Sequence, residues 1–329
     1  MNPTVLVTGA NGYTGGNLCR YLAARGIPVR AMYWAPDGKP EFCDDTIHPV
    51  AGDLRDRDGL SRILEGIDIV YNIAALYRPT NVSNKMYWDV NVEGTRNIVE
   101  LAAEANVKRF VHCSTIGVHG TIENPPATED APLNPDDYYQ FTKLKGEQLC
   151  REIGQETGMP VVIVRPAAIY GPRERRFFTL TRLIQKGRFV MFGKGDVLYH
   201  FIHIDDLCEA FLRCAESPAA VGQTYIVADD RAISLNKVID ILAKTLNVAP
   251  PRIRLPLFVL YAASIACEFA CKPFGLSPPL HRRRASWFSS DRSFDIDKIR
   301  SELGFMPKFT PDAGLADMVR SYREAGWLP

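Results

Sequence analysis

Tyr139 and Lys143 are four positions apart in a segment with a helical pattern. Residues at this spacing are neighbours on one face of a helix. A phenol has a pKa of about 10, and a nearby ammonium stabilises its ionised form. The pair therefore predicts a tyrosine that exchanges a proton with a substrate oxygen near neutral pH. The alternative is that both residues lie on a solvated helix face.

A glycine-rich loop near the start of the sequence is suited to binding phosphate. Gly9, Gly12 and Gly15 form a G-x-x-G-x-x-G pattern between a short apolar strand, Val5–Thr8, and a helical segment. Glycine lets the backbone approach a pyrophosphate closely, and a helix N-terminus offers free N–H groups to an anion. This context favours dinucleotide binding over a purely structural turn.

The elements that must position these residues alternate between apolar strands and helices. Strands are predicted at Val5–Thr8, Val29–Tyr33, Ile69–Ile73, Phe110–Ser114 and Val161–Arg165, and helices at Tyr13–Arg25, Leu60–Glu65, Met86–Ala105 and Tyr139–Glu156. Uniformly apolar strands separated by helices indicate a parallel sheet covered on both faces. We therefore predict an α/β fold with a doubly wound, Rossmann-type parallel sheet, which binds ligands at the carboxyl ends of its strands.

The second half of the chain predicts a smaller C-terminal substrate-binding lobe. We assign residues 1–165 to the dinucleotide-binding domain, with residues 199–230 returning to it, and residues 166–198 and 231–329 to the lobe. The division rests on the point at which the regular alternation of strands and helices ends.

The most apolar helical stretch of the chain is Leu257–Ala270. It is too short for a transmembrane helix, which needs about 20 residues. We favour a helix buried in the smaller lobe. The alternatives are a lid over a hydrophobic substrate and a peripheral contact with a membrane surface that also involves Arg282–Arg284.

Composition excludes several classes of protein. The 329 residues carry 39 Lys and Arg against 38 Asp and Glu, a net charge of +1, so no overall field attracts nucleic acid. None of the eight cysteines forms a C-x-x-C pair or clusters with histidine at zinc-ligand spacing, so we expect no metal site and a reduced, cytoplasmic protein. The first residues lead directly into a strand, and we expect no signal peptide.

Several motifs together resemble the extended short-chain dehydrogenase/reductase family, also called the NAD-dependent epimerase/dehydratase family. The glycine loop and Tyr139-x-x-x-Lys143 match two of its signatures. Two further landmarks are Arg165-Pro-Ala-Ala-Ile-Tyr-Gly-Pro172 and Phe201-Ile-His-Ile-Asp-Asp206. The resemblance covers residues 4 to about 215 and implies an enzyme that acts on a small molecule with a nicotinamide cofactor.

The resemblance also implies which residues surround the cofactor: Gly9, Asn11, Gly12, Tyr13, Gly15, Asp53, Leu54, Ala74, Ala75, Asn91, Lys143, Pro166 and Ile169. Lys143 would hold the nicotinamide ribose. The second strand ends at Tyr33-Trp34, which is neither the acid typical of NAD sites nor the Arg typical of NADP sites. Both cofactors stay open, and the absence of the basic partner favours NAD.

Thr115 is the third catalytic residue that the resemblance implies. In the family's S-[ST]-x-x-V-x-G segment, the second hydroxyl residue hydrogen-bonds the substrate oxygen, and Thr115 occupies that position here. We expect Ser114 to bond to the backbone. His112 and His119 flank the segment, and we interpret both as structural.

The predicted activity is hydride transfer between a secondary alcohol and NAD(P) by Tyr139, Lys143 and Thr115. The motifs are closest to the 3β-hydroxysteroid and sterol dehydrogenase branch, so we favour a bulky hydrophobic substrate. Tyr199 stands near the place where nucleotide-sugar epimerases carry an Arg for the substrate diphosphate, although Arg173, Arg175 and Arg176 could compensate.

Three alternatives remain. A nucleotide-sugar 4-epimerase with tightly bound NAD ranks second, and a dehydratase third, because Ile116-Gly117 lacks the acid that dehydratases commonly need. A non-catalytic NAD(P)-sensing regulator ranks last, since Tyr139 and Lys143 are both present. The resemblance further implies a homodimer formed through the helices 86–105 and 139–156.

Overall fold

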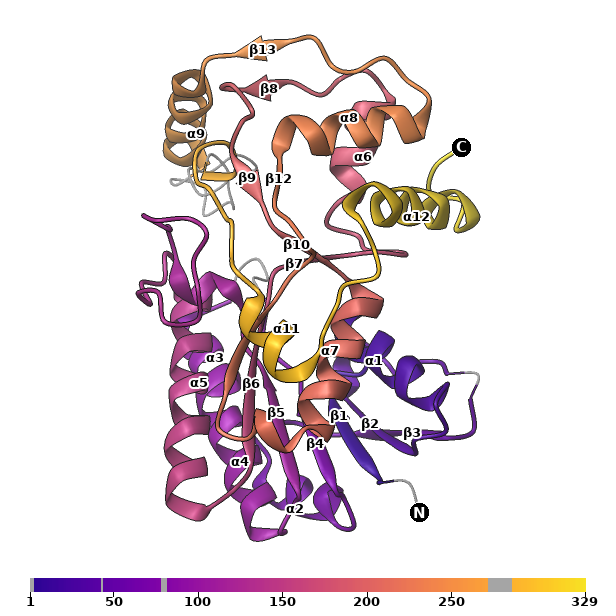
Figure 1. Ribbon diagram of the computed structural model, residues 1–329, viewed down its shortest axis with the longest axis vertical. Coiled ribbons are helices and arrows are strands. Elements are labelled where there is room, and N and C mark those ends of the chain that lie inside the picture. Colours follow the sequence, from indigo (N-terminus) through magenta and orange to yellow (C-terminus); the bar gives the residue numbers. More distant parts are fainter. Residues whose placement is uncertain (1–2, 43, 78–81, 272–285) are drawn as a thin grey trace.

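Seven parallel strands form the central sheet of the larger domain, drawn in the lower half of Figure 1. The computed structural model describes residues 3–42, 44–77, 82–271 and 286–329. The strands are β1 (Val5–Thr8), β2 (Val29–Tyr33), β3 (Ile47–Ala51), β4 (Ile69–Asn72), β5 (Arg109–Cys113), β6 (Val161–Pro166) and β11 (Thr224–Val227). Their order is β11-β6-β5-β4-β1-β2-β3. The order reverses between β1 and β4, which is where such sheets bind ligands.

Helices cover both faces of the sheet, which confirms the doubly wound, Rossmann-type prediction. On one face lie α1 (Tyr13–Ala23), α7 (Ile204–Glu216) and α11 (Asp297–Leu303), and on the other α2 (Arg57–Leu64), α4 (Gly94–Glu104) and α5 (Tyr138–Thr157). Along β1, Val5 and Val7 belong to the first core and Leu6 to the second. Because successive strand residues face opposite sides, a sheet covered twice needs strands that are apolar throughout.

The helix predicted over Met86–Ala105 has three parts. They are α3 (Asn84–Trp88), a π-helical turn (Asp89–Glu93) and α4. A π-helical turn inserts one extra residue into the helical ladder and is frequent at functional sites. Here it contains Asn91, whose side chain is buried.

The smaller lobe lies beyond the carboxyl ends of the sheet strands (Figure 1). It contains α6 (Phe178–Gln185), α8 (Leu235–Leu246), α9 (Leu257–Cys271), α12 (Pro311–Glu324) and the short strands β8 (Met191–Phe192), β9 (Leu198–Tyr199), β12 (Ile233–Ser234) and β13 (Arg254–Leu255). At the junction of the two parts, β7 (Ala168–Tyr170) pairs in parallel with β10 (Phe201–His203). Short 3-10 turns occur at Ala35–Asp37, Ile116–His119, Pro218–Ala220 and Ser286–Phe288.

One segment assigned to the smaller lobe packs instead against the sheet. Phe294, Ile296, Ile299, Leu303 and Phe305 are buried in the core that α1 and α7 cover. The prediction that all of residues 231–329 belong to the lobe was therefore wrong for this segment. The reason is that α11, although late in the chain, buries its apolar side chains against β11.

The apolar helix α9 is mostly exposed, so the interpretation as a buried helix was wrong. Of its 15 residues, only Leu260 and Ser264 are buried. Phe258 is 70% exposed and Phe269 71% exposed. The helix packs against the lobe along one side only, near β8. Arg282–Arg284, which we had combined with this helix in one alternative, lie outside the described residues.

Among the described residues, no helix is long and apolar enough to cross a membrane.

Candidate active site

The helix α5 presents Tyr139 and Lys143 to the interior of the protein. Asp137 caps the helix, since its side chain accepts a hydrogen bond from the backbone N–H of Gln140 at 2.9 Å. Tyr139 is half-buried, whereas Lys143 is 2% exposed. The alternative of a solvated helix face does not apply, because an unused lysine would not be buried without compensation.

Burial shifts the pKa of Lys143 downward from its usual value, and the nearby Cys113, Cys150 and Glu147 act in the opposite direction. Glu147 lies one helical turn beyond Lys143 on α5. The ammonium therefore lies in a site with little water, where its field acts strongly on neighbouring groups.

Thr115 lies at the end of β5, at the start of the turn Ile116–His119. It is half-buried, and its hydroxyl oxygen accepts a hydrogen bond from the N–H of Gly117 at 3.1 Å. A Cβ at Gly117 would come within 3.0 Å of the Gln140 side chain. This close approach brings the Thr115 turn against the residue that follows Tyr139, so the structure places all three predicted catalytic residues in one region.

Ser114 does not bond to the backbone through its side chain, as we had expected. Its hydroxyl donates to Glu147 at 2.9 Å and is buried. The buried carboxylate is a stronger acceptor than a carbonyl oxygen. The Ser114 hydroxyl is thus used within the protein interior, whereas Thr115 is the half-buried residue of the pair.

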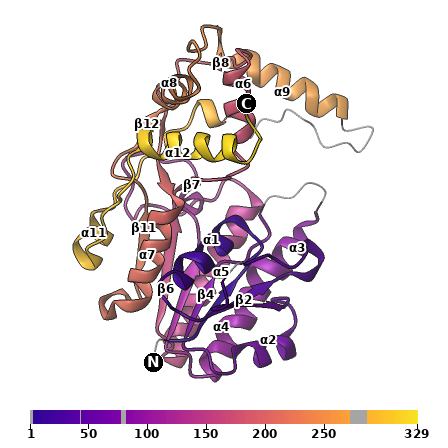
Figure 2. The same ribbon diagram turned by 90° about the vertical axis from the view of Figure 1, so that its right-hand side faces the viewer.

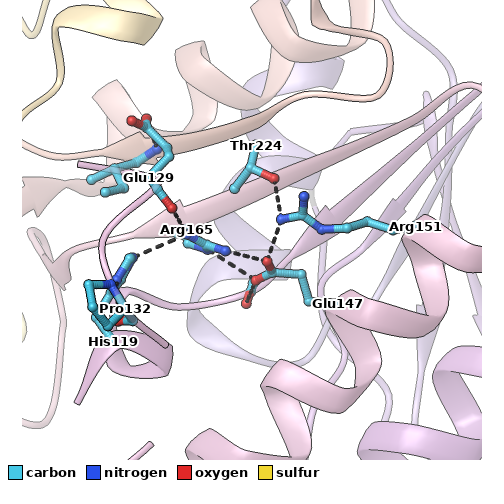
Figure 3. Close-up of polar contacts among 9 residues, drawn as sticks. His119, Glu129, Pro132, Glu147, Arg151, Arg165 and Thr224 are labelled. Atoms are coloured by element: carbon cyan, nitrogen blue, oxygen red, sulfur yellow. Dashed lines mark hydrogen bonds and ion pairs between the residues drawn. The ribbon is translucent and has the colours of Figure 1, made fainter. Parts of the chain in front are cut away.

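Beneath this region lies a buried ionic cluster, which Figure 3 shows in detail. Arg165 is 1% exposed and donates to Glu147 from Nε at 3.1 Å and from Nη2 at 2.5 Å. Arg151 donates both to Glu147 and to Thr224, at 2.7 Å in each case. Burial acts to raise the pKa of Glu147, but the hydrogen bonds and charges of Arg165 and Arg151 outweigh it and lower the pKa. The cluster ties α5 to β6 and β11.

The two flanking histidines have structural partners. His119 contacts the carbonyl of Pro132 and the Arg165 guanidinium, and His112 contacts the amide of Asn72 at 3.2 Å. Burial lowers the pKa of both rings, to about 4 for His119.

The glycine loop approaches the segment after β4 very closely. Gly9 has φ +71°, and a Cβ there would lie 2.9 Å from the Cα of Ala74. A Cβ at Gly15 would lie 2.3 Å from the carbonyl oxygen of Gly9, so both positions need glycine. Gly12 donates to the Gly9 carbonyl and caps α1. Glycine at these two positions therefore lets the loop pack closely on itself and on the segment after β4.

Thr8 fixes the same loop to the segment after β4, in which Ala74 and Ala75 are half-buried. Its hydroxyl accepts from the backbone N–H of Ile73 at 3.0 Å and of Ala74 at 2.9 Å, and it donates to Asn72. Two strand ends are thus joined directly beside the glycine loop.

Asn91 connects this segment to α5, the helix that carries Tyr139 and Lys143. From the π-helical turn, its side chain accepts from the N–H of Leu76 at 2.7 Å and donates to the hydroxyl of Thr142 at 3.0 Å. Leu54 is buried, and a Cβ at Gly94 would meet it at 2.7 Å. Asn91 and Leu54 are therefore buried residues that hold the backbone around the site in place.

Asn11 and Asp53 lie on the adenine side implied by the family. Asn11 donates to the carbonyl of Trp34 at 3.2 Å. Asp53 is paired with Arg55, whose hydrogen bonds lower the pKa of the carboxyl. Arg55 is a cation that the sequence argument on cofactor choice did not consider.

Tyr13 behaves differently from the other loop residues. Its phenol is buried with no partner among the described residues, and a Cβ at Gly171 would lie 3.1 Å from it. Its side chain therefore points to the junction of the two parts, and only its backbone remains at the loop. Pro166 ends β6, and Ile169 lies half-buried in β7.

Tyr77 is a neighbour of the site that sequence reasoning missed, and Arg176, which the sequence suggested only as a compensating cation for a diphosphate, lies beside it. The Tyr77 ring meets the Tyr139 ring edge-on at 5.1 Å. Arg176 donates to the Tyr77 hydroxyl at 3.5 Å and to the carbonyl of Ile169 at 2.8 Å. Only the position of Tyr77, two residues after Ala75, could have indicated its role.

Tyr199, the residue near the expected diphosphate clamp, is 1% exposed. Arg292 donates to its hydroxyl at 3.3 Å and lies over its ring at 5.4 Å from the centroid. A cation is therefore present beside Tyr199, although it comes from a distant part of the sequence.

The sheet order, the glycine loop at the switch point and the Tyr–Lys helix define an oxidoreductase of the Rossmann type. Residues 5–228 match the model of the NAD dependent epimerase/dehydratase family. The chain belongs to this family and is an enzyme of its dehydrogenase, epimerase and dehydratase group, as the motifs predicted.

Relatives of this chain act on different substrates. The sterol demethylase protein B of Methylococcus capsulatus is 30% identical, over 99% of this chain and 100% of its own. The N-acetyl-alpha-D-glucosaminyl-diphospho-ditrans,octacis-undecaprenol 4-epimerase of Escherichia coli O157:H7 is 27% identical, over 96% and 94%. The dTDP-glucose 4,6-dehydratase DesIV of Streptomyces venezuelae, solved with NAD bound, is 26% identical and has a TM-score of 0.79 with 98% of both chains covered.

Proposed function

We propose that this enzyme interconverts a secondary alcohol and a ketone on a bulky hydrophobic, sterol-like substrate, with NAD as the hydride carrier. The observation that carries the proposal is the half-buried Tyr139 beside the buried Lys143. The likeness to a protein that acts on sterols supports the substrate class.

The proposed residues divide the chemistry among them. In the direction of oxidation, Tyr139 takes the hydroxyl proton, while Thr115 donates a hydrogen bond to the substrate oxygen as charge develops on it. A bound nicotinamide would supply the hydride acceptor, and the products would be a ketone, reduced cofactor and the proton taken up by Tyr139. Lys143 lowers the pKa of the phenol by its charge.

NAD fits the residues present. Gly12 is exposed at the N-terminus of α1, whose first N–H groups have no partner within the helix. Asp53 lies at the adenosine end that the family resemblance implies. NAD is bound in the related dehydratase. Arg55 is already paired with Asp53, which favours NAD over NADP.

The second candidate is a 4-epimerase that acts on a sugar diphosphate. Arg292 beside Tyr199 favours it, since a cation there suits a diphosphate. The relative that acts on an undecaprenol-linked sugar also favours it. In that reaction the hydride would return to the other face of the same carbon, with no net reduction of the cofactor.

The decisive experiment compares the wild-type enzyme with Tyr139→Phe in assays with NAD. We expect accumulation of NADH with a 3β-hydroxysteroid, and a loss of about 10²–10⁴-fold in kcat in the variant. NAD binding by the variant, measured by calorimetry, should be nearly unchanged. An altered UDP-sugar without net NADH would contradict the proposal and favour the epimerase. Bound NAD without turnover of any alcohol or sugar would favour the regulator.

We further propose a homodimer formed through α3, α4 and α5. Met86 and Phe141 are 37% and 36% exposed, and Tyr87 packs edge-on against Tyr138. These apolar groups gather on the surface of the helices that the family resemblance implicates. Light scattering after gel filtration tests the dimer.

The free cysteines suit a reducing compartment such as the cytoplasm.

A further inference from the structure

We propose that Cys267 and Cys271 on α9 bind a soft, two-coordinate metal cation such as Cu(I) between their sulfur atoms. The two residues are four positions apart, so their side chains are neighbours on one face of the helix. Both are half-buried, and both are free cysteines. The inference goes beyond the proposed function, because this ligand is neither the substrate nor the dinucleotide.

Access to solvent distinguishes this pair from the other cysteines that the structure describes. Five of those are buried, namely Cys19, Cys113, Cys150, Cys208 and Cys214. Burial raises the pKa of each of these five thiols, so they stay protonated and are poor metal ligands. Cys43 lies outside the described residues. Figures 1 and 2 both place α9 at the margin of the smaller lobe, where a dissolved ion can reach the pair.

The two thiols are also in contact with each other. Desolvation, together with a hydrogen bond to Cys267 and the charge of that group, raises the pKa of Cys271. Thiols that hydrogen-bond to each other have sulfur atoms close enough to share one small ion. The ion takes the place of the protons, so Cu(I) and two thiols give a bis-thiolate complex and two released protons.

The spacing on the helix favours a metal bridge over a disulfide. The Cβ atoms of residues four positions apart on a helix are separated by about 5–6 Å, whereas a disulfide needs a Cβ separation of about 3.5–4.5 Å. Closing an S–S bond would therefore distort α9. With metal–sulfur bonds of about 2.3 Å, the two sulfur atoms can lie as much as about 4.6 Å apart, which the intact helix allows.

The number of protein ligands identifies the class of ion. Among the described residues, no group of three or more His, Cys, Asp or Glu side chains could hold a metal ion. A structural zinc site takes four ligands, so two thiolates alone do not form one. Cu(I) is a soft ion that thiolates select, and two thiolates in line satisfy its coordination. The expectation of no metal site rested on zinc-type spacings and did not consider a site with two ligands.

Ser264 is a hydrogen-bond donor beside the pair. Its hydroxyl is buried and has no partner among the described residues. Ser264 is three positions before Cys267, and Leu260, the other buried residue of α9, is four positions earlier on the same side. The pair therefore continues the inner side of the helix. There the serine hydroxyl can donate to the sulfur of Cys267 when that sulfur is a thiolate.

The test is an anaerobic titration of the purified enzyme with Cu(I), in competition with the coloured chelator bicinchoninate and without substrate or NAD. Every protein carries Cys43→Ser, so that only cysteines in the described residues are compared. We expect one Cu(I) to bind to each chain, more tightly as the pH rises. Cys267→Ser and Cys271→Ser should each weaken binding by about 100-fold, because the second thiolate acts at a high effective concentration.

A matched control separates a chelate from two independent thiols. Ala266→Cys combined with Cys267→Ala keeps two thiols on α9 but places them five positions apart, where side chains do not face each other. This double variant should bind as weakly as the single variants. Cys208→Ala, at a buried thiol on α7, should bind like the parent protein.

Three outcomes would overturn the inference. They are an absence of Cu(I) binding, equal binding by the parent and the variant with shifted thiols, and a disulfide between Cys267 and Cys271 that forms on mild oxidation while the helix stays intact. Because no turnover is measured, failure of this test leaves the proposed oxidoreductase activity untouched. Conversely, an inactive enzyme that still binds Cu(I) would contradict only the proposed function.

Discussion

Two buried carboxylates, Glu147 in the sheet domain and Asp229 at the junction with the smaller lobe, have opposite electrostatic surroundings. Glu147 is hydrogen-bonded to Arg165 and Arg151, and its pKa is lowered. Asp229 accepts from the Tyr170 phenol at 3.1 Å and from the His203 N–H at 3.2 Å. Burial raises its pKa to about 7.

The difference shows how the neighbours of a carboxyl group decide its charge at equal burial. Two guanidinium groups keep Glu147 ionised and make it a fixed link between α5 and the strands. A phenol and a backbone N–H do not offset the burial of Asp229, so its charge depends on pH near neutrality. The charge of Glu147 in the sheet domain is thus fixed, while the charge of Asp229 at the junction with the smaller lobe changes with pH.

Removing the ionic link should have the largest effect. Glu147→Leu leaves Arg165 buried without its carboxylate, and we expect the free energy of unfolding to fall by about 3–5 kcal/mol in urea titrations. The matched control is Glu152→Leu on the exposed side of α5, which should change stability by no more than about 0.5 kcal/mol. Equal effects of the two substitutions would show that the cluster has no special role.

The next largest effect should be on the pH dependence of stability, which Asp229 contributes to between pH 4 and 7 and Glu147 does not. The folded-state pKa of Asp229 is raised, so its contribution to stability is present below pH 4 and is lost as the pH rises towards about 7. The loss is no more than about 4 kcal/mol. Asp229→Asn should remove this part of the pH dependence in thermal denaturation series, whereas Asp230→Asn at the exposed neighbour should retain it. A wild-type stability that rises between pH 4 and 7 relative to Asp229→Asn would contradict the assignment.

The smallest effect is expected at α9. Because Phe258 is already 70% exposed, Phe258→Asp should change the free energy of unfolding by about 0.5 kcal/mol or less. A loss of several kcal/mol would mean that the helix is packed more deeply than its exposure indicates. The measurement shows whether the exposed side of α9 contributes to folding.

The sequence was sufficient to predict the sheet, the glycine loop and the helix that carries Tyr139 and Lys143, because each has a local pattern. Val5–Thr8 is apolar on both faces, and Tyr139 and Lys143 are related by one helical turn. Tyr77 and Arg292 were missed because contacts between distant segments bring them to Tyr139 and Tyr199 respectively. The exposure of α9 was missed for the opposite reason, since apolar composition predicts burial in general but does not reveal whether a partner helix exists.

The alternation of the chain between its two parts constrains how this enzyme can change in evolution. The chain leaves the sheet after β6, returns with β10 and α7, leaves again after β11 and returns with α11 before α12. No uninterrupted stretch of gene therefore encodes the smaller lobe. Recombination cannot exchange it as a module, and new substrate preferences have to arise through substitutions and short insertions in place. That constraint is consistent with relatives that match nearly the whole length of this chain although their names refer to a sterol demethylase and to an epimerase of a lipid-linked sugar.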